Sequence, residues 1–270
     1  MLNGERVVFN GVNRHEWNAD RGRAIGADDM HAAMTVFKKN NINAVRTCHY
    51  PDQSLWYDLC DRNGIYMIDE TNLESHGSWQ KLGAVEPSWN VPGSLPEWKD
   101  CVVDRARSMF ERDKNHAAVL IWSCGNESYA GEDILAMSQF FHDHDPGRLV
   151  HYEGVFHCRA FDAISDMESR MYAKPWESPR VSRIPPEEAL HSLRIYARYG
   201  QLAGRHGELC ALGRRVRPVP GGFIWDYMDQ ALRHTDALGR SVLGYGGDFA
   251  DRNTDYNFSG NGIVYADGAE

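Results

Sequence analysis

The stretch VLIWSCGNES, residues Val119–Ser128, joins an apolar run to a polar turn. Its first part, Val119–Cys124, is rich in aliphatic and aromatic residues and predicts a buried strand. The turn that follows carries a carboxyl group, Glu127, and an amide, Asn126, at the point where the strand ends. A carboxyl group in that place can act as a general acid and then as a general base. The alternative interpretation is that Glu127 caps a following helix, because Asn-Glu-Ser also suits a strand-to-helix turn.

The rest of the chain repeats this alternation of short apolar strands and amphipathic helices, which indicates parallel βαβ units. The predicted strands are Val7–Asn13, Ala44–His49, Ile65–Glu70, Val119–Cys124, Leu149–Glu153, Ile164–Tyr172 and Gly222–Tyr227. The predicted helices are Asp28–Asn40, Ser54–Arg62, Glu97–Lys114 and Asp133–Asp143. We therefore predict an α/β fold, a (β/α)₈ TIM barrel. Its seventh strand region is disrupted, because nothing between Tyr172 and Gly222 has the pattern of a strand.

Polar residues stand where most of these predicted strands end. In a parallel barrel the C-terminal ends of the strands carry the catalytic groups. A core strand that ends in a carboxylate or histidine, strand after strand, is hard to explain by stability alone and predicts an enzyme. The residues at these ends are Arg14-His15-Glu16, His49-Tyr50, Asp69-Glu70, Asn126-Glu127, Glu153, Glu168 and Asp226.

Composition narrows the class of protein. The 270 residues suit one barrel domain, 1–270, that lacks flanking domains, and a net charge of -9 argues against nucleic acid as a partner. The sequence has neither an apolar run long enough for a membrane span nor the pattern of a signal peptide. Its six cysteines form no CxxC pair, which indicates reduced thiols in a cytoplasmic protein. The eight Trp and 12 Tyr suit stacking on sugars, although large aromatics also fill barrel cores.

A second polar motif lies in the segment Asp69–Gly77, which contains Glu74 and His76. Their i, i+2 spacing puts both side chains on one side of an extended segment. Together with Glu127 they form an oxygen-rich set with one imidazole, which suits Mg²⁺. Taken alone, Glu-x-His is more often part of a solvated loop than a pair of ligands.

The sequence resembles glycoside hydrolase family 2 at several of these motifs. Residues 122–128, Trp-Ser-Cys-Gly-Asn-Glu-Ser, are similar to the family's acid/base motif, and Asp69–Gly77 resembles its magnesium-binding loop. The serine after Glu127 resembles the β-galactosidases, whereas the β-glucuronidases commonly have proline there. The resemblance covers nearly the whole chain except Ser178–Pro220. It implies that Glu127 is the acid/base and that Glu74, His76 and Glu127 hold Mg²⁺.

Further stretches of the chain resemble parts of the family's sugar site, and the resemblance implies a role for each. His15 and His49 are expected to bond sugar hydroxyls, with Asn126 as another substrate contact, although a lone strand-end histidine is usually structural. Tyr172 is expected beside the nucleophile, and Trp225 as the platform under the sugar. Phe258 and Asn261 match a monovalent-cation loop, so Na⁺ is a further expected ion, at a site that lacks a ligand from an upstream domain.

The function that the resemblance implies is hydrolysis of terminal β-D-galactose residues from β-D-galactosides with retention of configuration, by a homo-oligomeric enzyme. Two alternatives remain. One is a catalytically dead sugar-binding remnant, and the other is a β-glucuronidase of the same family.

The chain lacks the nucleophile that a retaining enzyme needs. That second carboxylate lies about 5–5.5 Å from the acid/base, and the family carries it in a motif similar to Cys-Glu-Tyr-(Ala/Thr)-His-Ala-Met-Gly-Asn. Residues 193–201, LRIYARYGQ, stand in its place, so the nucleophile is absent and expected at Arg194. Leu-Arg-Ile-Tyr can be encoded as CTG CGA ATA TAC, a choice among synonymous codons, and this string read one base later gives Cys-Glu-Tyr. We therefore hypothesise a frame error at about 178–220; a pseudogene and real divergence are the alternatives.

Overall fold

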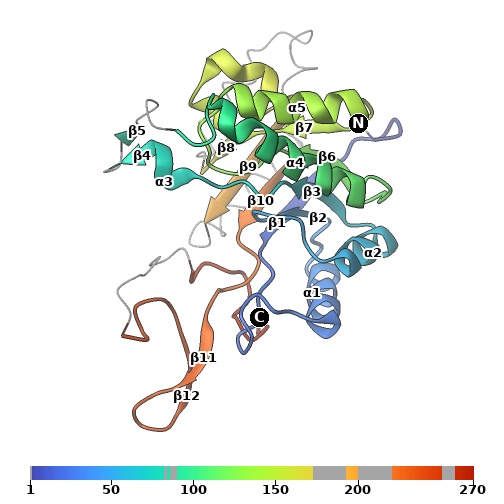
Figure 1. The fold of residues 1–270 in the computed structure, drawn as a ribbon. Coiled ribbons are helices and arrows are strands. Elements are labelled where there is room, and N and C mark those ends of the chain that lie inside the picture. Colours follow the sequence, from blue (N-terminus) through green and yellow to red (C-terminus); the bar gives the residue numbers. More distant parts are fainter. Residues whose placement is uncertain (1, 82–83, 86–89, 173–192, 200–220, 251–258) are drawn as a thin grey trace.

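The structure is a computed structural model that describes residues 2–81, 84–85, 90–172, 193–199, 221–250 and 259–270. Within these residues, eight parallel strands form one sheet in the spatial order β7-β6-β3-β2-β1-β10-β9-β8 (Figure 1). This is the chain order followed around a barrel. The two end strands meet where the Asp166 amide donates to the Val150 carbonyl at 2.9 Å. The strands are β1 Phe9–Arg14, β2 Ala44–Thr47, β3 Tyr66–Glu70, β6 Val119–Ser123, β7 Leu149–His151, β8 Met167–Met171, β9 Leu193–Tyr199 and β10 Gly221–Trp225.

Four longer helices lie outside the strands. The helices α1 (Ala27–Lys39), α2 (Ser54–Asn63), α4 (Pro96–Asp113) and α5 (Glu132–His144) each bury an apolar face and leave charged residues outside, and the predictions for all four are confirmed within two residues at each end. Shorter elements complete the described chain. They are α3 His76–Trp79, β4 Gln80–Lys81, β5 Ala84–Val85, η1 Glu153–Phe156, η2 Arg159–Ile164, β11 Leu232–Thr235 and β12 Ser241–Gly244.

The inside of the barrel changes from apolar to polar along the strands. Because side chains alternate across a strand, residues two apart share a face. Near the N-terminal ends the interior is a buried apolar cluster that contains Ile68 and Ile121. Two residues further along the same strands stand Glu70 and Ser123, both fully buried. The apolar cluster therefore closes one end of the barrel, and a polar layer lies beneath the other. The buried members of the apolar cluster are Phe9, Ala44, Ile68, Ile121, Met167 and Phe223.

The prediction that no strand lies between Tyr172 and Gly222 is wrong, because β9 pairs in parallel with β8 and β10. Strand pairing uses backbone groups, and β8 and β10 offer two unpaired edges to any segment between them. The sequence of β9, LRIYARY, also alternates in hydrophobicity, which the prediction overlooked. The remainder of the segment to which the frame error is assigned, 178–192 and 200–220, lies outside the described residues.

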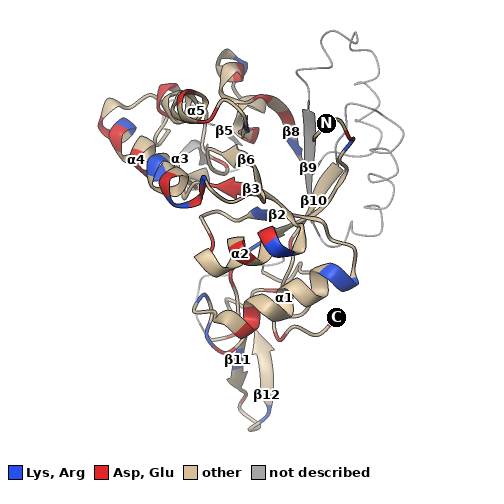
Figure 2. Cartoon of the chain, turned by 90° about the vertical axis from the view of Figure 1, so that its right-hand side faces the viewer, with Lys and Arg blue, Asp and Glu red and all other residues tan. Residues whose placement is uncertain are grey.

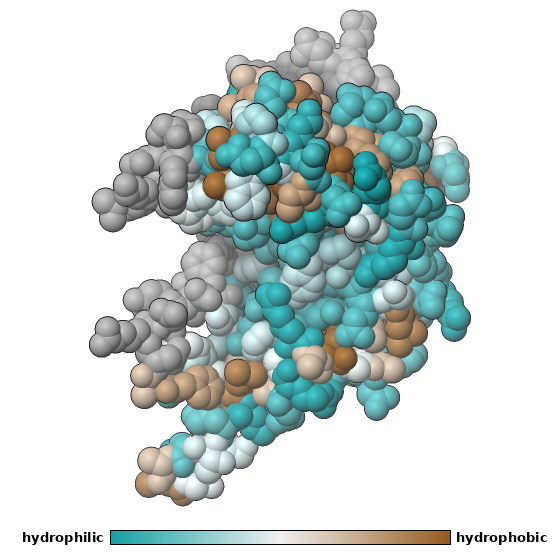
Figure 3. Space-filling model, in the orientation of Figure 1, coloured by the Kyte–Doolittle hydropathy of each residue, from teal (hydrophilic) through white to brown (hydrophobic). Residues whose placement is uncertain are grey.

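The surface is charged and largely hydrophilic. Figure 2 shows acidic and basic residues side by side on the outer helices, and Figure 3 shows apolar atoms only in small separate patches on the face it presents. The five cysteines in the described residues are all free. No helix in the described part of the chain is long and apolar enough to cross a membrane.

Candidate active site

A buried ion pair occupies the centre of the polar layer. Arg46 of β2 donates from Nε and Nη2 to the two carboxylate oxygens of Glu70 at 2.7 and 2.9 Å. Ser123 donates to Glu70 at 2.7 Å, and the His49 Nδ1 lies 2.7 Å from the same carboxylate. Arg46 also donates to the side-chain oxygen of Asn126 at 2.9 Å. The pair thus links β2 and β3 to the turn that carries Glu127.

Electrostatics fix the charge of this layer. Burial alone opposes an ionised Glu70, but Arg46 and His49 outweigh burial and lower the pKa of Glu70 to about 2. Burial and the nearby Arg46 cation lower the pKa of His151 to about 3, so that imidazole is neutral. The layer is therefore a fixed set of charges and hydrogen bonds at neutral pH.

Glu127 lies in a tight turn after β6 and has a left-handed backbone, with φ of 34°. A side chain other than glycine in this region costs of the order of 1–3 kcal/mol unless its surroundings hold it. Two neighbouring segments hold this turn. The Asn126 amide donates to the Leu73 carbonyl at 2.8 Å, and the Glu127 amide donates to the Glu153 carboxyl at 2.7 Å. The predicted strand-end position of Glu127 is confirmed, and a helix cap is excluded because α5 begins five residues later, at Glu132.

The loop after β3 brings Glu74 and His76 to Glu127. The His76 Nδ1 lies 3.2 Å from a Glu127 carboxylate oxygen, and the ligand atoms of all three residues lie within 4.8 Å of one another. The Asn126 side-chain amide donates to Glu74, which orients that carboxylate. Three hard or borderline donors at this spacing fit a divalent cation such as Mg²⁺. The predicted grouping of these three residues is therefore present in the structure.

The charges of this cluster support one another. Burial alone raises the pKa of Glu127, but the hydrogen bond and positive charge of His76 outweigh burial and give a net lowered pKa. The same hydrogen bond to Glu127 raises the pKa of His76. Burial raises the pKa of Glu74. A bound cation would replace the His76 proton as the positive charge that faces the two carboxylates.

An aromatic wall lies beside the polar layer. His49 stacks on Trp225 with ring centroids 5.2 Å apart and planes 7° apart. His15 meets the edges of both rings, at 5.5 Å from His49 and 5.4 Å from Trp225. Burial lowers the pKa of His15, which is therefore neutral at pH 7. The structure brings together these three residues, which were predicted on separate strands.

The other predicted site residues have different outcomes. Tyr172 follows β8 directly. Asn261 is buried, and neither polar atom of its side chain has a hydrogen-bond partner within the described residues. Phe258 lies outside the described residues. Glu168 is the second residue of β8 and bonds Arg159, so it lies at the N-terminal end of the barrel, and the prediction that it ends a strand is wrong.

The register of β9 places Arg194 in an unexpected position. Arg194 pairs with Glu168 at the start of β8, whereas Tyr199 pairs with Trp225 at the end of β10. Position 194 thus lies at the N-terminal end of β9, while Glu127 lies at the C-terminal ends of the strands. This backbone register differs from the expectation that residue 194 lies at the mouth. The register of a strand follows the alternation of its own sequence.

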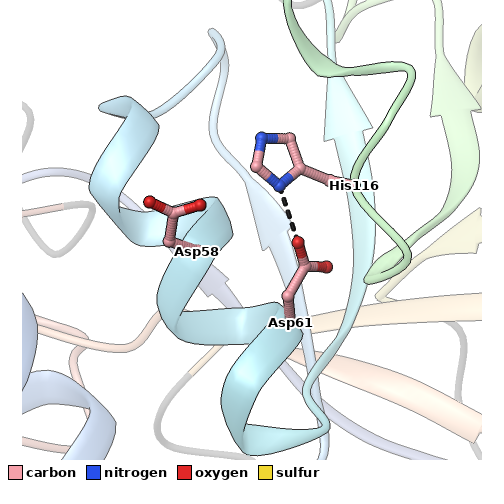
Figure 4. Close-up of side chains that lie close together, drawn as sticks. All are labelled: Asp58, Asp61 and His116. Atoms are coloured by element: carbon pink, nitrogen blue, oxygen red, sulfur yellow. Dashed lines mark hydrogen bonds and ion pairs between the residues drawn. The ribbon is translucent and has the colours of Figure 1, made fainter.

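A second cluster of ligand-type side chains lies on the outside of the barrel. Asp58 and Asp61 of α2 face His116, which precedes β6 (Figure 4). The His116 Nδ1 lies 2.7 Å from one Asp61 oxygen, and the Ala118 amide donates to the other at 2.7 Å. Both Asp61 oxygens therefore serve to join α2 to the barrel, and this cluster is a structural contact at the N-terminal end of β6.

Comparison with known proteins decides the family. Residues 1–269 match the model of the TIM barrel domain of glycosyl hydrolases family 2. The chain belongs to this family. It is 58% identical over 267 residues to a β-galactosidase of Halalkalibacterium halodurans, which covers 98% of the chain and 26% of that protein. It is 54% identical to a β-galactosidase large subunit of Lactobacillus acidophilus, over 99% of the chain and 43% of that protein. The chain thus spans less than half the length of these relatives.

Solved structures of two β-glucuronidases show the same fold. A β-glucuronidase of Ruminococcus gnavus superposes with a TM-score of 0.70 over 100% of this chain and 49% of its own, at 18% identity. One from Faecalibacterium prausnitzii gives 0.68 at 21% identity, over 100% of this chain and 48% of its own. At such identity the likeness concerns the fold alone. The predictions of the family and of the TIM barrel are confirmed.

The sequence analysis missed several residues of this family 2 site. The role of Arg46 at the centre of the polar layer was not predicted, although its strand end was singled out. The hydroxyl of Tyr152 accepts a hydrogen bond from the Ser128 amide at 3.1 Å, next to Glu127. Glu153 was noted only as a strand-end carboxylate. The sequence pattern that could have identified Arg46 is a charged residue two positions after an apolar one, Ala44, on the same face of a predicted core strand.

Proposed function

We propose that this chain is the catalytic barrel of an enzyme that hydrolyses terminal non-reducing β-D-galactose residues of β-D-galactosides with retention of configuration. The observation that carries this proposal is the Glu74, His76 and Glu127 cluster beside the aromatic wall of His15, His49 and Trp225, in one mouth of the barrel. The relatives at 50–58% identity over nearly the whole chain are named β-galactosidases or their large subunits.

Each side chain has a role in this proposal. Glu127 protonates the oxygen of the leaving group and later takes a proton from the attacking water. His15, His49 and Asn126 bond the sugar hydroxyls, and Trp225 packs against the sugar ring. Tyr172 bonds the nucleophile in an intact enzyme.

Two cations complete the proposal. Glu74, His76 and Glu127 would hold Mg²⁺, which when bound supplies positive charge that fixes the orientation of Glu127. Asn261 and Phe258 would hold Na⁺. The side-chain oxygen of Asn261, which is buried and has no hydrogen-bond partner in the described residues, is a suitable donor for such an ion.

We further propose that the chain is inactive with residues 178–220 as they stand in this sequence. A retaining enzyme needs a second carboxylate as nucleophile, on which the covalent glycosyl-enzyme intermediate forms. Residues 193–201, LRIYARYGQ, contain no carboxylate in the place of the family's nucleophile motif, so this intermediate has no group to form on. A frame error across residues 178–220 explains both the loss of the carboxylate and the basic composition of the segment.

The register of β9 sharpens the experiment. Because residue 194 lies at the N-terminal end of β9, a lone Arg194→Glu change is expected to leave the chain inactive. Replacement of residues 178–220 by the segment read in the shifted frame is expected to restore hydrolysis of a chromogenic β-galactoside. Failure of that restored chain on every glycoside tested would refute the enzyme proposal, and efficient turnover by the literal chain would refute the missing nucleophile.

The same assay separates the alternatives. A remnant that only binds sugar gives galactose binding without turnover before and after restoration. A β-glucuronidase turns over the chromogenic β-glucuronide in preference to the β-galactoside. Ser128 after the acid/base favours the galactosidase.

Location and assembly are also part of the proposal. The free cysteines in the described residues suit a reducing cytoplasm, and the relatives named as large subunits suit a protein that works in an oligomer.

A further inference from the structure

We infer that Glu153 is a positioning residue that sets the place of the acid/base Glu127 through its backbone. The inference rests on the proposed function, because it assigns a supporting contact to the proposed acid/base. Glu153 begins η1, with one residue between it and the end of β7, and its carboxyl is the acceptor for the Glu127 amide at 2.7 Å. It touches the backbone of Glu127, whereas His76 touches the side chain.

The backbone conformation of Glu127, which Glu153 supports, is unfavourable for a residue other than glycine. A left-handed φ of 34° at Glu127 has to be imposed by neighbours, since the residue is not glycine. The three successive amides of the turn each have a partner. Leu73 accepts from Asn126, Glu153 accepts from Glu127, and the Tyr152 hydroxyl accepts from Ser128.

Two of these three partners come from the end of β7. Tyr152 and Glu153 are consecutive residues, and both are buried. The Tyr152 hydroxyl also donates to the Ser128 carbonyl, so the residue after Glu127 is held at both its backbone groups. A carboxylate whose catalytic use demands a position good to about half an ångström needs such support from a neighbouring strand.

The contact of Glu153 is specific to the Glu127 amide. Its other carboxyl oxygen is buried and has no hydrogen-bond partner within the described residues. A purely structural glutamate at a buried site normally satisfies both oxygens. Besides the bond to its own backbone, the carboxyl of Glu153 bonds the amide of Glu127, the residue that carries the proposed acid/base side chain.

The test uses three changes of Glu153 in this chain. Glu153→Gln keeps an acceptor at the same reach, Glu153→Asp keeps the carboxyl but shortens the reach by one methylene, and Glu153→Leu removes the acceptor. The matched control is Tyr57→Phe, which removes a buried 2.6 Å hydrogen bond to Asp69 on the helix side of β3. Hydrogen exchange of the Glu127 amide and Mg²⁺ affinity, measured by titration calorimetry, are the two readouts.

The inference predicts which of these variants change the exchange of the Glu127 amide and the Mg²⁺ affinity. Glu153→Leu and Glu153→Asp are expected to accelerate exchange of the Glu127 amide by more than tenfold and to weaken Mg²⁺ binding by roughly 10–100-fold. Glu153→Gln and Tyr57→Phe are expected to stay within about threefold of the parent on both readouts. If Glu153→Leu does not fold, the contrast between Asp and Gln decides.

Two results would overturn it. Unchanged exchange at Glu127 in Glu153→Asp and Glu153→Leu would show that the contact does not hold the turn. If Glu153→Gln and Glu153→Asp lose equal amounts of exchange protection and Mg²⁺ affinity, the length of the side chain does not matter. The carboxyl group then has only a general structural role. Absence of Mg²⁺ binding by the parent chain would instead contradict the proposed metal site, and the exchange pattern at Glu127 would then decide the role of Glu153.

Discussion

The Arg46 and Glu70 pair offers the sharpest test of how the polar layer is held. Their side chains are 5% and 0% exposed, and Arg46 donates to both oxygens of Glu70. Arg46→Met leaves Glu70 buried without its main cation. Removal of one partner of such a pair costs about 3–5 kcal/mol, because the remaining charge stays out of water. We expect a loss of this size in the free energy of unfolding at pH 7.

The pH dependence of stability gives an independent measure of the same pair. Arg46 and His49 lower the pKa of Glu70 from 4.5 to about 2 against the effect of burial. At about 1.36 kcal/mol per pH unit this corresponds to about 3 kcal/mol. Because the folded pKa is depressed, the stabilisation is present above pH 4.5 and is lost as the pH falls toward 2. Arg46→Met should flatten this part of the curve, although His49 and Ser123 still reach Glu70.

Urea unfolding at several pH values from 7 down to about 2 measures both effects. The double variant Arg46→Met with Glu70→Leu removes both charges, and it is expected to be more stable than Arg46→Met alone. A loss below 1 kcal/mol in Arg46→Met, with the acid slope of the parent retained, would refute the argument that this pair anchors the layer.

Two other predictions follow from the barrel interior and the site. Gly11→Ala should destabilise the chain by about 1–3 kcal/mol in urea unfolding, because the new Cβ would lie 2.4 Å from the Phe223 ring, whereas Gly77→Ala meets nothing within 4 Å and serves as the control. An equal loss in both variants would contradict this. Glu127→Gln should weaken Mg²⁺ binding by at least about tenfold and, in the chain with the restored segment, lower kcat by roughly 10²–10⁴-fold. Unaltered Mg²⁺ affinity in this variant would remove Glu127 from the proposed ligand set.

Sequence reasoning predicted most of the fold because the barrel repeats one pattern. Apolar runs such as Val119–Cys124 and the apolar face of helix Ser54–Arg62 each carry their own period, and both elements formed where predicted. The exception is β9, whose alternation LRIYARY was overlooked in the prediction. Pairing there is decided by the free edges of β8 and β10, which a local pattern does not reveal.

The candidate site was predictable where the chemistry lies at strand ends and unpredictable where it depends on contacts across the barrel. Glu74, His76 and Glu127 could be grouped from motifs, and the structure places their ligand atoms within 4.8 Å. The neighbours that hold them could not, since the 2.7 Å bond from the Glu127 amide to Glu153 joins residues 26 apart, one in the turn after β6 and the other in η1.

The described contacts of the polar layer come from strands outside residues 178–220. Arg46, Glu70 and Asn126 bond one another across β2, β3 and β6, and the apolar cluster beneath them draws on strands outside the suspect segment. The described contacts of this layer involve no residue of 178–220, although β10, which carries Trp225, pairs with β9. Under the hypothesis of a frame error, the segment loses the proposed nucleophile, whereas the proposed ligand set and the aromatic wall all lie outside it. For this reason we expect replacement of that one segment to restore activity without change elsewhere.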